Sequence, residues 1–166
     1  VHAATSYFGH HKGYTMMDKA FGDEEILSDV KKLMEESSEV LIKKYGFDKD
    51  QLDKFKEAKL NRFLKTASHD EVARVARDPQ RKLGKTDRLV SPAISAYDNN
   101  SSYDYLAKAI AYAFKYDNKE DEKAMEIQEY IKENGIEKAI EQYTEITKKQ
   151  RPGLFEKILD QYKKID

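Results

Sequence analysis

Helical spacing of the apolar residues is the feature that most constrains the fold. From about Asp23 to Tyr45 these residues recur at intervals of three and four, as one buried face of a helix requires. Acidic residues open this segment, lysines close it and Gly46 follows it, which is the order that helix caps and the helix dipole favour. Val, Ile and Thr alternate with polar residues over no useful length. These patterns predict an all-α protein.

The middle of the chain predicts shorter helices and a bend. A second helix starts near Asp48, and a short third helix covers Ser68 to Arg77, with Ser68 as its cap. Asp78 and Pro79 suit the cap and the first position of a new turn, because proline lacks the amide that would stay unpaired there.

Breaks at Gly84 and Pro92 separate this region from the last part of the chain. Four further helices are predicted there, at 102–116, about 120–134, 136–146 and 152–164. The first of them is rich in alanine, which lets a neighbouring helix approach closely. Since no repeat or linker is visible, we expect a single helical domain over residues 1–166.

Composition excludes several classes of function. The formal net charge of −1 gives no overall attraction to nucleic acid or to membranes, and no apolar run is long enough to span a bilayer. The chain has no cysteine, which excludes disulfides, thiol catalysis and cysteine metal sites. This composition fits a reducing compartment, and we expect a cytoplasmic protein.

Cations are concentrated in one segment. Residues 59–90 hold nine Lys or Arg and four Asp or Glu, and they include five of the six arginines. Arg74, Arg77 and Arg81 follow at helical intervals, with Lys82 beside the last, and a bend at Pro79 would make them converge. Guanidinium groups bind phosphate through paired hydrogen bonds, so this pattern predicts an anion site. The alternative is structural ion pairing with Asp70, Asp78 or Asp87.

The same segment resembles a known group of enzymes. The run RVARDPQRKL at 74–83, followed by DRL at 87–89, resembles the hallmark stretch of mannitol-1-phosphate 5-dehydrogenases, within the polyol-specific long-chain dehydrogenase family. Three other stretches resemble that family in the right order: HAATSYFG at 2–9, MEESSEVLIKKYGFD at 34–48 and LAKAIAYAFKYDNKEDEKAMEI at 106–127.

The resemblance implies a fold and an activity. It implies a helical carboxy-terminal domain, similar to that of 6-phosphogluconate dehydrogenase, which closes over the substrate behind an upstream Rossmann domain for NAD. Such enzymes transfer hydride between NADH and fructose 6-phosphate, giving mannitol 1-phosphate, without a metal. The chain begins at Val1 within what reads as a structured region, so we expect a carboxy-terminal half that is inactive alone. Its expected partners are the sugar phosphate and its own amino-terminal domain, not nucleic acid or a membrane.

The resemblance also implies roles for individual residues. His2 matches the family's catalytic histidine, whereas the catalytic lysine and asparagine would lie upstream of this chain. Arg74 and Lys82, eight residues apart, match the sugar-binding arginine and lysine. Arg77 and Arg81 are additional cations, which relatives acting on unphosphorylated mannitol lack, and they favour a phosphorylated substrate. No residue of this chain is expected to bind a metal or to form the cofactor site.

Two alternatives stay open. A related enzyme, such as mannitol 2-dehydrogenase or a fructuronate or tagaturonate reductase, would share most of these motifs. A helical interaction module would instead present the arginines as an open stripe to acidic partners, with affinity that falls steeply in salt. The enzyme hypothesis predicts that His2 and the four cations line one cleft. It also predicts an exposed apolar patch where the missing domain packs.

Overall fold

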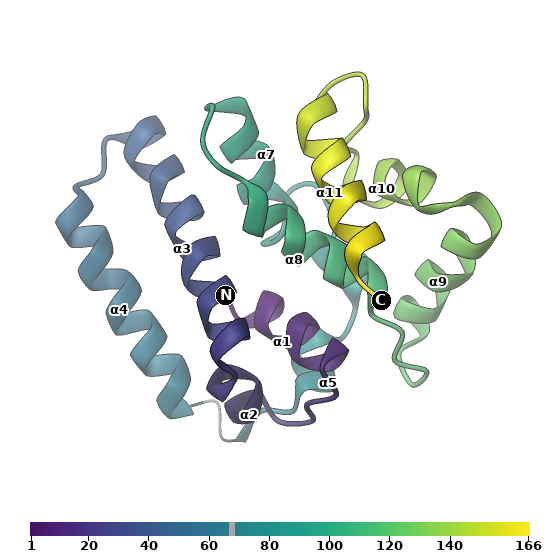
Figure 1. Ribbon diagram of the computed structural model, residues 1–166, viewed down its shortest axis with the longest axis horizontal. Coiled ribbons are helices and arrows are strands. Elements are labelled where there is room, and N and C mark those ends of the chain that lie inside the picture. The colour runs from purple at the N-terminus through teal and green to yellow at the C-terminus, as the bar shows by residue number, and fades with distance from the viewer. Residues whose placement is uncertain (67–68) are drawn as a thin grey trace.

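The computed structural model describes residues 1–66 and 69–166, and these residues form helices without a β-strand (Figure 1). The predicted all-α class is therefore confirmed. In chain order the helices are α1 (His2–His11), α2 (Met17–Gly22), α3 (Glu24–Tyr45), α4 (Lys49–Thr66), α5 (Val72–Ala76), α6 (Pro79–Lys82), α7 (Val90–Asp98), α8 (Asp104–Lys115), α9 (Glu122–Asn134), α10 (Ile136–Thr144) and α11 (Pro152–Lys164). Among the described helices, none combines the length and the apolar character needed to cross a bilayer.

Helix α8 is the centre of the core. It contacts α1, α3, α7, α9 and α11, and Figure 1 shows α11 lying across it. Its alanines are almost completely buried, so they let these neighbours approach closely. Phe114 at its carboxyl end and Phe155 of α11 are fully enclosed, and burial of such side chains is the main stabilising contribution to the domain.

The ends of α3 follow the predicted capping signals. Asp23 lies just before the helix and accepts hydrogen bonds from the backbone amides of Glu25 and Ile26, both at 3.0 Å. Gly46 ends the helix with φ of 68°, in the left-handed conformation that glycine adopts without strain. The later helices lie within two residues of their predicted bounds, because caps and periodicity are local signals.

Other local predictions were wrong. Pro92 does not break a helix but is the third residue of α7, where a proline costs little because first-turn amides have no helical partner. The third predicted helix starts only at Val72, after Asp70 and Glu71 adopt non-helical conformations. The predicted cap at Ser68 lies outside the described residues. Helices α1, α2 and α7 were not predicted as separate elements.

Helix α4 forms one edge of the molecule, beside α3 (Figure 1). Leu52 is its single buried residue among those described, whereas Phe55 is 61% exposed. An apolar groove of about 180 Å³ lies among α3, α4 and α8, and Val1, Leu52, Phe55 and Leu89 contribute to its lining. Helix α4 is therefore the least embedded of the long helices.

Candidate functional site

A cleft of about 580 Å³ lies between the start of α1 and the segment that contains α5 and α6. The five residues predicted from the sequence all line it: His2, Arg74, Arg77, Arg81 and Lys82. Further lining residues are Ala3, Phe63, Asp70, Val75, Asp78 and Arg88. We call this the basic cleft. The cations thus share a concavity instead of forming an open stripe, while their roles in binding stay predictions.

His2 forms one wall of the basic cleft, at the first position of α1. Its ring packs against Phe63, with ring centroids 4.5 Å apart, and against Phe21 at 5.7 Å. Its Nε2 lies 3.4 Å from Oδ2 of Asp70. Burial lowers the pKa of His2, and the nearby Asp70 carboxylate only partly opposes this shift. This shift favours the neutral form of the imidazole.

Asp70 was not predicted as a functional residue, although it faces both His2 and Arg74. Its Oδ1 accepts a hydrogen bond from the Arg74 guanidinium. Burial opposes ionisation of this carboxyl, but the hydrogen bonds from Arg74 and His2 outweigh burial and hold its pKa below the usual value. The signal available in the sequence was its spacing of four residues from Arg74, which suited an ordinary ion pair equally well.

The predicted structural ion pairs are partly present. Three arginines have carboxylate neighbours, in the pairs Arg74 with Asp70, Arg81 with Asp78 and Arg88 with Asp87. Arg77 makes no ion pair with any described residue. The paired arginine side chains stay about 60% exposed, with 63% for Arg74 and 59% for Arg81. Each guanidinium has five N–H donors, so these arginines keep donors for a ligand.

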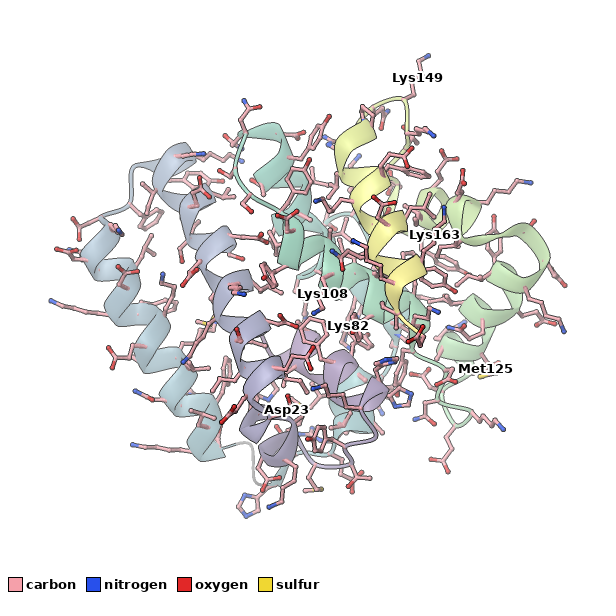
Figure 2. All side chains as sticks on the ribbon, viewed as in Figure 1. Asp23, Lys82, Lys108, Met125, Lys149 and Lys163 are labelled. Carbon is pink, nitrogen blue, oxygen red and sulfur yellow. The ribbon has the colours of Figure 1, made fainter. Side chains whose placement is uncertain are left out.

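Lys82 is the most enclosed cation of the basic cleft, with 3% of its surface exposed. Figure 2 shows it well inside the outline of the molecule, whereas Lys149 extends outward. Its Nζ donates a hydrogen bond to the carbonyl oxygen of Arg77, and no carboxylate among the described residues forms an ion pair with it. Burial, followed by repulsion from Arg81 and Arg88, lowers the pKa of Lys82 to about 8. The site therefore holds a buried ammonium that makes no direct ion pair with a carboxylate of the described residues.

An unusual backbone conformation at Asp78 determines how the cations of α5 and α6 are placed relative to one another. This residue has φ of 58° and ψ of 65°, in the left-handed region, and so turns the chain sharply between α5 and α6. Its amide donates to Oδ2 of Asp121 at 2.9 Å, and its own carboxylate accepts from the Arg81 amide at 3.2 Å. The predicted cap at Asp78 is confirmed. As the predicted bend at Pro79 requires, Arg74 and Arg81 lie on two separate short helices.

The family is shown by a comparison of the whole sequence. The family model described as the mannitol dehydrogenase C-terminal domain matches residues 1–166. The chain belongs to this mannitol dehydrogenase C-terminal domain family. The resemblance inferred from the run at 74–83 is thereby confirmed.

Curated relatives of this mannitol dehydrogenase domain carry a more specific name. Mannitol-1-phosphate 5-dehydrogenase from Geobacillus stearothermophilus is 40% identical over 148 residues, which cover 89% of this chain and 39% of that protein. The enzyme of the same name from Thermoanaerobacter pseudethanolicus is 37% identical over 165 residues, covering 99% of this chain and 42% of that protein. The chain thus spans about two fifths of the length of these relatives.

A solved structure shares the fold of this mannitol dehydrogenase domain. Pseudomonas fluorescens mannitol 2-dehydrogenase, in a ternary complex with NAD and D-mannitol, matches with a TM-score of 0.72 and 19% sequence identity. The match covers 98% of this chain and 35% of the other. At this identity the likeness concerns the fold, and it agrees with the helical domain that the sequence predicted.

The residues of this mannitol dehydrogenase domain do not fit a dinucleotide site of the Rossmann type. Such a site needs a glycine-rich turn between a strand and a helix. The seven glycines of the sequence form no such motif, and residues 1–66 and 69–166 contain no strand. Within the same residues, no group of three or more His, Cys, Asp or Glu is arranged to hold a metal ion.

Proposed function

We propose that this chain is the substrate-binding domain of an NAD-dependent mannitol-1-phosphate 5-dehydrogenase, which interconverts mannitol 1-phosphate and fructose 6-phosphate. The observation that carries the proposal is the basic cleft, where His2 and four predicted cations face one another. The names of the curated relatives support the choice of substrate.

The charges of the basic cleft suit the phosphate of such a substrate. Lys82 and Arg77 have no carboxylate partner among the described residues, so a bound dianion would supply the missing counter-charge. Charge-assisted hydrogen bonds of this kind are short and strong, especially where water is partly excluded. We assign Arg77 and Arg81 to the phosphate, and Arg74 and Lys82 to the phosphate or to hydroxyl groups of the hexitol.

His2 has a different role in this proposal. A neutral imidazole can donate one hydrogen bond and accept another, so it can orient a substrate hydroxyl or a catalytic group beside it. Phe21 and Phe63 pack on its ring and keep water away from that side. The general base and the NAD site would belong to the amino-terminal domain, and no residue of this chain is assigned to the hydride step.

The partner in this proposal is an amino-terminal domain of the same enzyme. The relatives are more than twice as long as the matched segment. The apolar groove beside α4 adjoins the basic cleft, since Arg88 lines both. A domain that covered the groove would bury Phe55 and would close the cleft over its ligand at the same time.

The partner proposal predicts that the isolated chain does not turn over. With NADH and fructose 6-phosphate, we expect no decrease in NADH absorbance above background, because the proposal assigns the general base and the dinucleotide site to the amino-terminal domain. Adding the amino-terminal domain of a relative, or fusing that domain ahead of Val1, should restore turnover. Turnover by the isolated chain at the rate of the fused enzyme would contradict this assignment.

The choice of substrate predicts discrimination by charge. In the fused enzyme we expect mannitol 1-phosphate to bind about 10- to 100-fold more tightly than mannitol, as one or two charge-assisted hydrogen bonds allow. Calorimetric competition between the two ligands measures the ratio. Arg77→Gln should reduce it, whereas Arg151→Gln should not, because Arg151 pairs with Asp98 outside the cleft.

Two results would redirect the proposal. Equal affinity for mannitol and mannitol 1-phosphate would favour an enzyme for free polyols or uronates. Tighter binding of a polyanion such as heparin, with a steep loss of affinity in salt, would favour the interaction module instead.

A further inference from the structure

One carboxylate in the basic cleft, that of Asp70, contacts two residues to which the proposed function gives different roles. Oδ2 of Asp70 faces Nε2 of His2 at 3.4 Å, and Oδ1 accepts from the guanidinium of Arg74. His2 belongs to α1, whereas Arg74 belongs to α5, about 70 residues further along the chain. The two side chains are therefore connected through a single carboxylate.

The backbone holds this carboxylate in place. The carbonyl oxygen of Asp70 accepts from the amide of Met17 at 2.9 Å, and the amide of Val72 donates to the carbonyl oxygen of Thr15, also at 2.9 Å. An isolated antiparallel bridge between Met16 and Glu71 lies between these two bonds. These hydrogen bonds flank Glu71, and the first of them is made by Asp70 itself, so they fix the backbone of Asp70 to residues 15–17 at the start of α2.

We propose that Asp70 is a positioning residue that couples His2 to Arg74, the arginine that the proposed function assigns to the substrate. The proposal rests on the proposed function, and it adds a residue that neither the sequence motifs nor the comparisons assign. Asp70 orients the imidazole of His2 on one side and the guanidinium of Arg74 on the other. The distance between these two groups in the cleft is thereby fixed.

The contact with Asp70 also sets the tautomer of His2. An ionised carboxylate accepts hydrogen bonds and cannot donate them, so Nε2 of the neutral imidazole carries the proton. Nδ1 is then the acceptor, and it is buried without a hydrogen-bond partner among the described residues. A hydrogen-bond donor that reaches Nδ1 would therefore find its lone pair already oriented. Arg74, meanwhile, is 63% exposed and keeps free N–H groups for a ligand.

The test uses Asp70→Asn in the fused enzyme. An amide of the same shape has an NH2 donor in place of one acceptor oxygen, so it cannot accept from His2 and Arg74 at the two positions that the carboxylate oxygens occupy. We expect kcat/KM for mannitol 1-phosphate to fall about 10- to 100-fold, as misplacement of reacting groups commonly causes. The affinity for inorganic phosphate should stay equal or rise, because one negative charge leaves the cleft.

A matched control is Glu71→Gln. This substitution removes one negative charge from the neighbouring residue, which is exposed, does not line the cleft and makes no side-chain cap bond to α5. We expect kcat/KM to change less than twofold. Equal losses of kcat/KM in the two variants would overturn the proposal, because they would show a general effect of charge on this segment.

A spectroscopic readout separates this proposal from the proposed function. In the parent, the ¹⁵N signals of His2 should show a protonated Nε2, and in Asp70→Asn the pKa of His2 should fall, because the carboxylate that raises it is gone. Unchanged His2 signals in the variant would overturn the positioning role, whatever the substrate is. Failure of the parent to bind mannitol 1-phosphate would instead overturn the proposed function.

Discussion

Lys82→Met is expected to bind phosphate about 100-fold more weakly than the parent while folding more stably. Removing a buried charge that contacts a ligand typically costs about 2–5 kcal/mol of binding free energy. The same ammonium is unfavourable in the free protein, because burial and the neighbouring arginines oppose its charge. We expect the free energy of unfolding to rise by about 1 kcal/mol at pH 7, after allowing for water in the open cleft.

The dependence of this stability on pH gives a second check. The pKa of Lys82 is about 8 in the folded chain and 10.5 for an ordinary lysine, so between these values the unfolded state binds more protons. The parent should therefore gain stability as the pH rises from 8 toward 10.5, while Lys82→Met lacks this gain. Urea unfolding at pH 7 and pH 10 measures the difference, and the advantage of the variant should shrink at pH 10.

Lys149→Met is the control for this pair of effects. Lys149 extends into solvent away from the basic cleft (Figure 2), so its substitution should change neither phosphate affinity nor the stability curve. A Lys82→Met variant that keeps the phosphate affinity of the parent would contradict the role of the cleft as an anion site.

Phe114→Ala should destabilise the fold by about 3–5 kcal/mol, the usual cost of truncating a buried phenylalanine. Phe114 is fully buried in α8, and its ring lies 6.4 Å from that of Tyr143. The alanine would leave a cavity where the central helix meets α10, and the rigid core cannot close it completely. Denaturant unfolding monitored by circular dichroism measures the loss.

Phe55→Ala is the matched control in the same assay. The same truncation on exposed α4 should change the free energy of unfolding by less than about 0.5 kcal/mol. Similar losses in the two variants would show that α4 is part of the cooperative core, which its 61% exposure at Phe55 argues against.

Features that depend on neighbouring residues were predictable from the sequence. The ends of α3 follow from Asp23 and Gly46, and the cap at Asp78 follows from the proline after it. The gathering of the cations was also predictable, because arginines spaced by three and four residues stay close even when the helix between them is interrupted.

Features that depend on contacts between distant parts of the chain were not predictable from the sequence. Asp70 is a functional candidate only because the Met16–Glu71 bridge brings it to His2, and one sequence does not reveal that bridge. At the left-handed turn, the amide of Asp78 donates to the carboxylate of Asp121, 43 residues later, and this contact also has no local signal. Pro92 was misread because a proline in the first turn of a helix and a proline after a helix give the same local signal.

The loose attachment of α4 has a thermodynamic consequence for the cleft. A helix with one buried residue opens locally at a lower free energy than the core, so its amides should exchange with solvent before those of α8. Phe63 belongs to this helix and also forms part of the wall around His2. Any ligand that contacts Phe63 therefore shifts α4 toward its ordered state. By reciprocity, any partner that orders α4 increases the affinity for that ligand by the same factor.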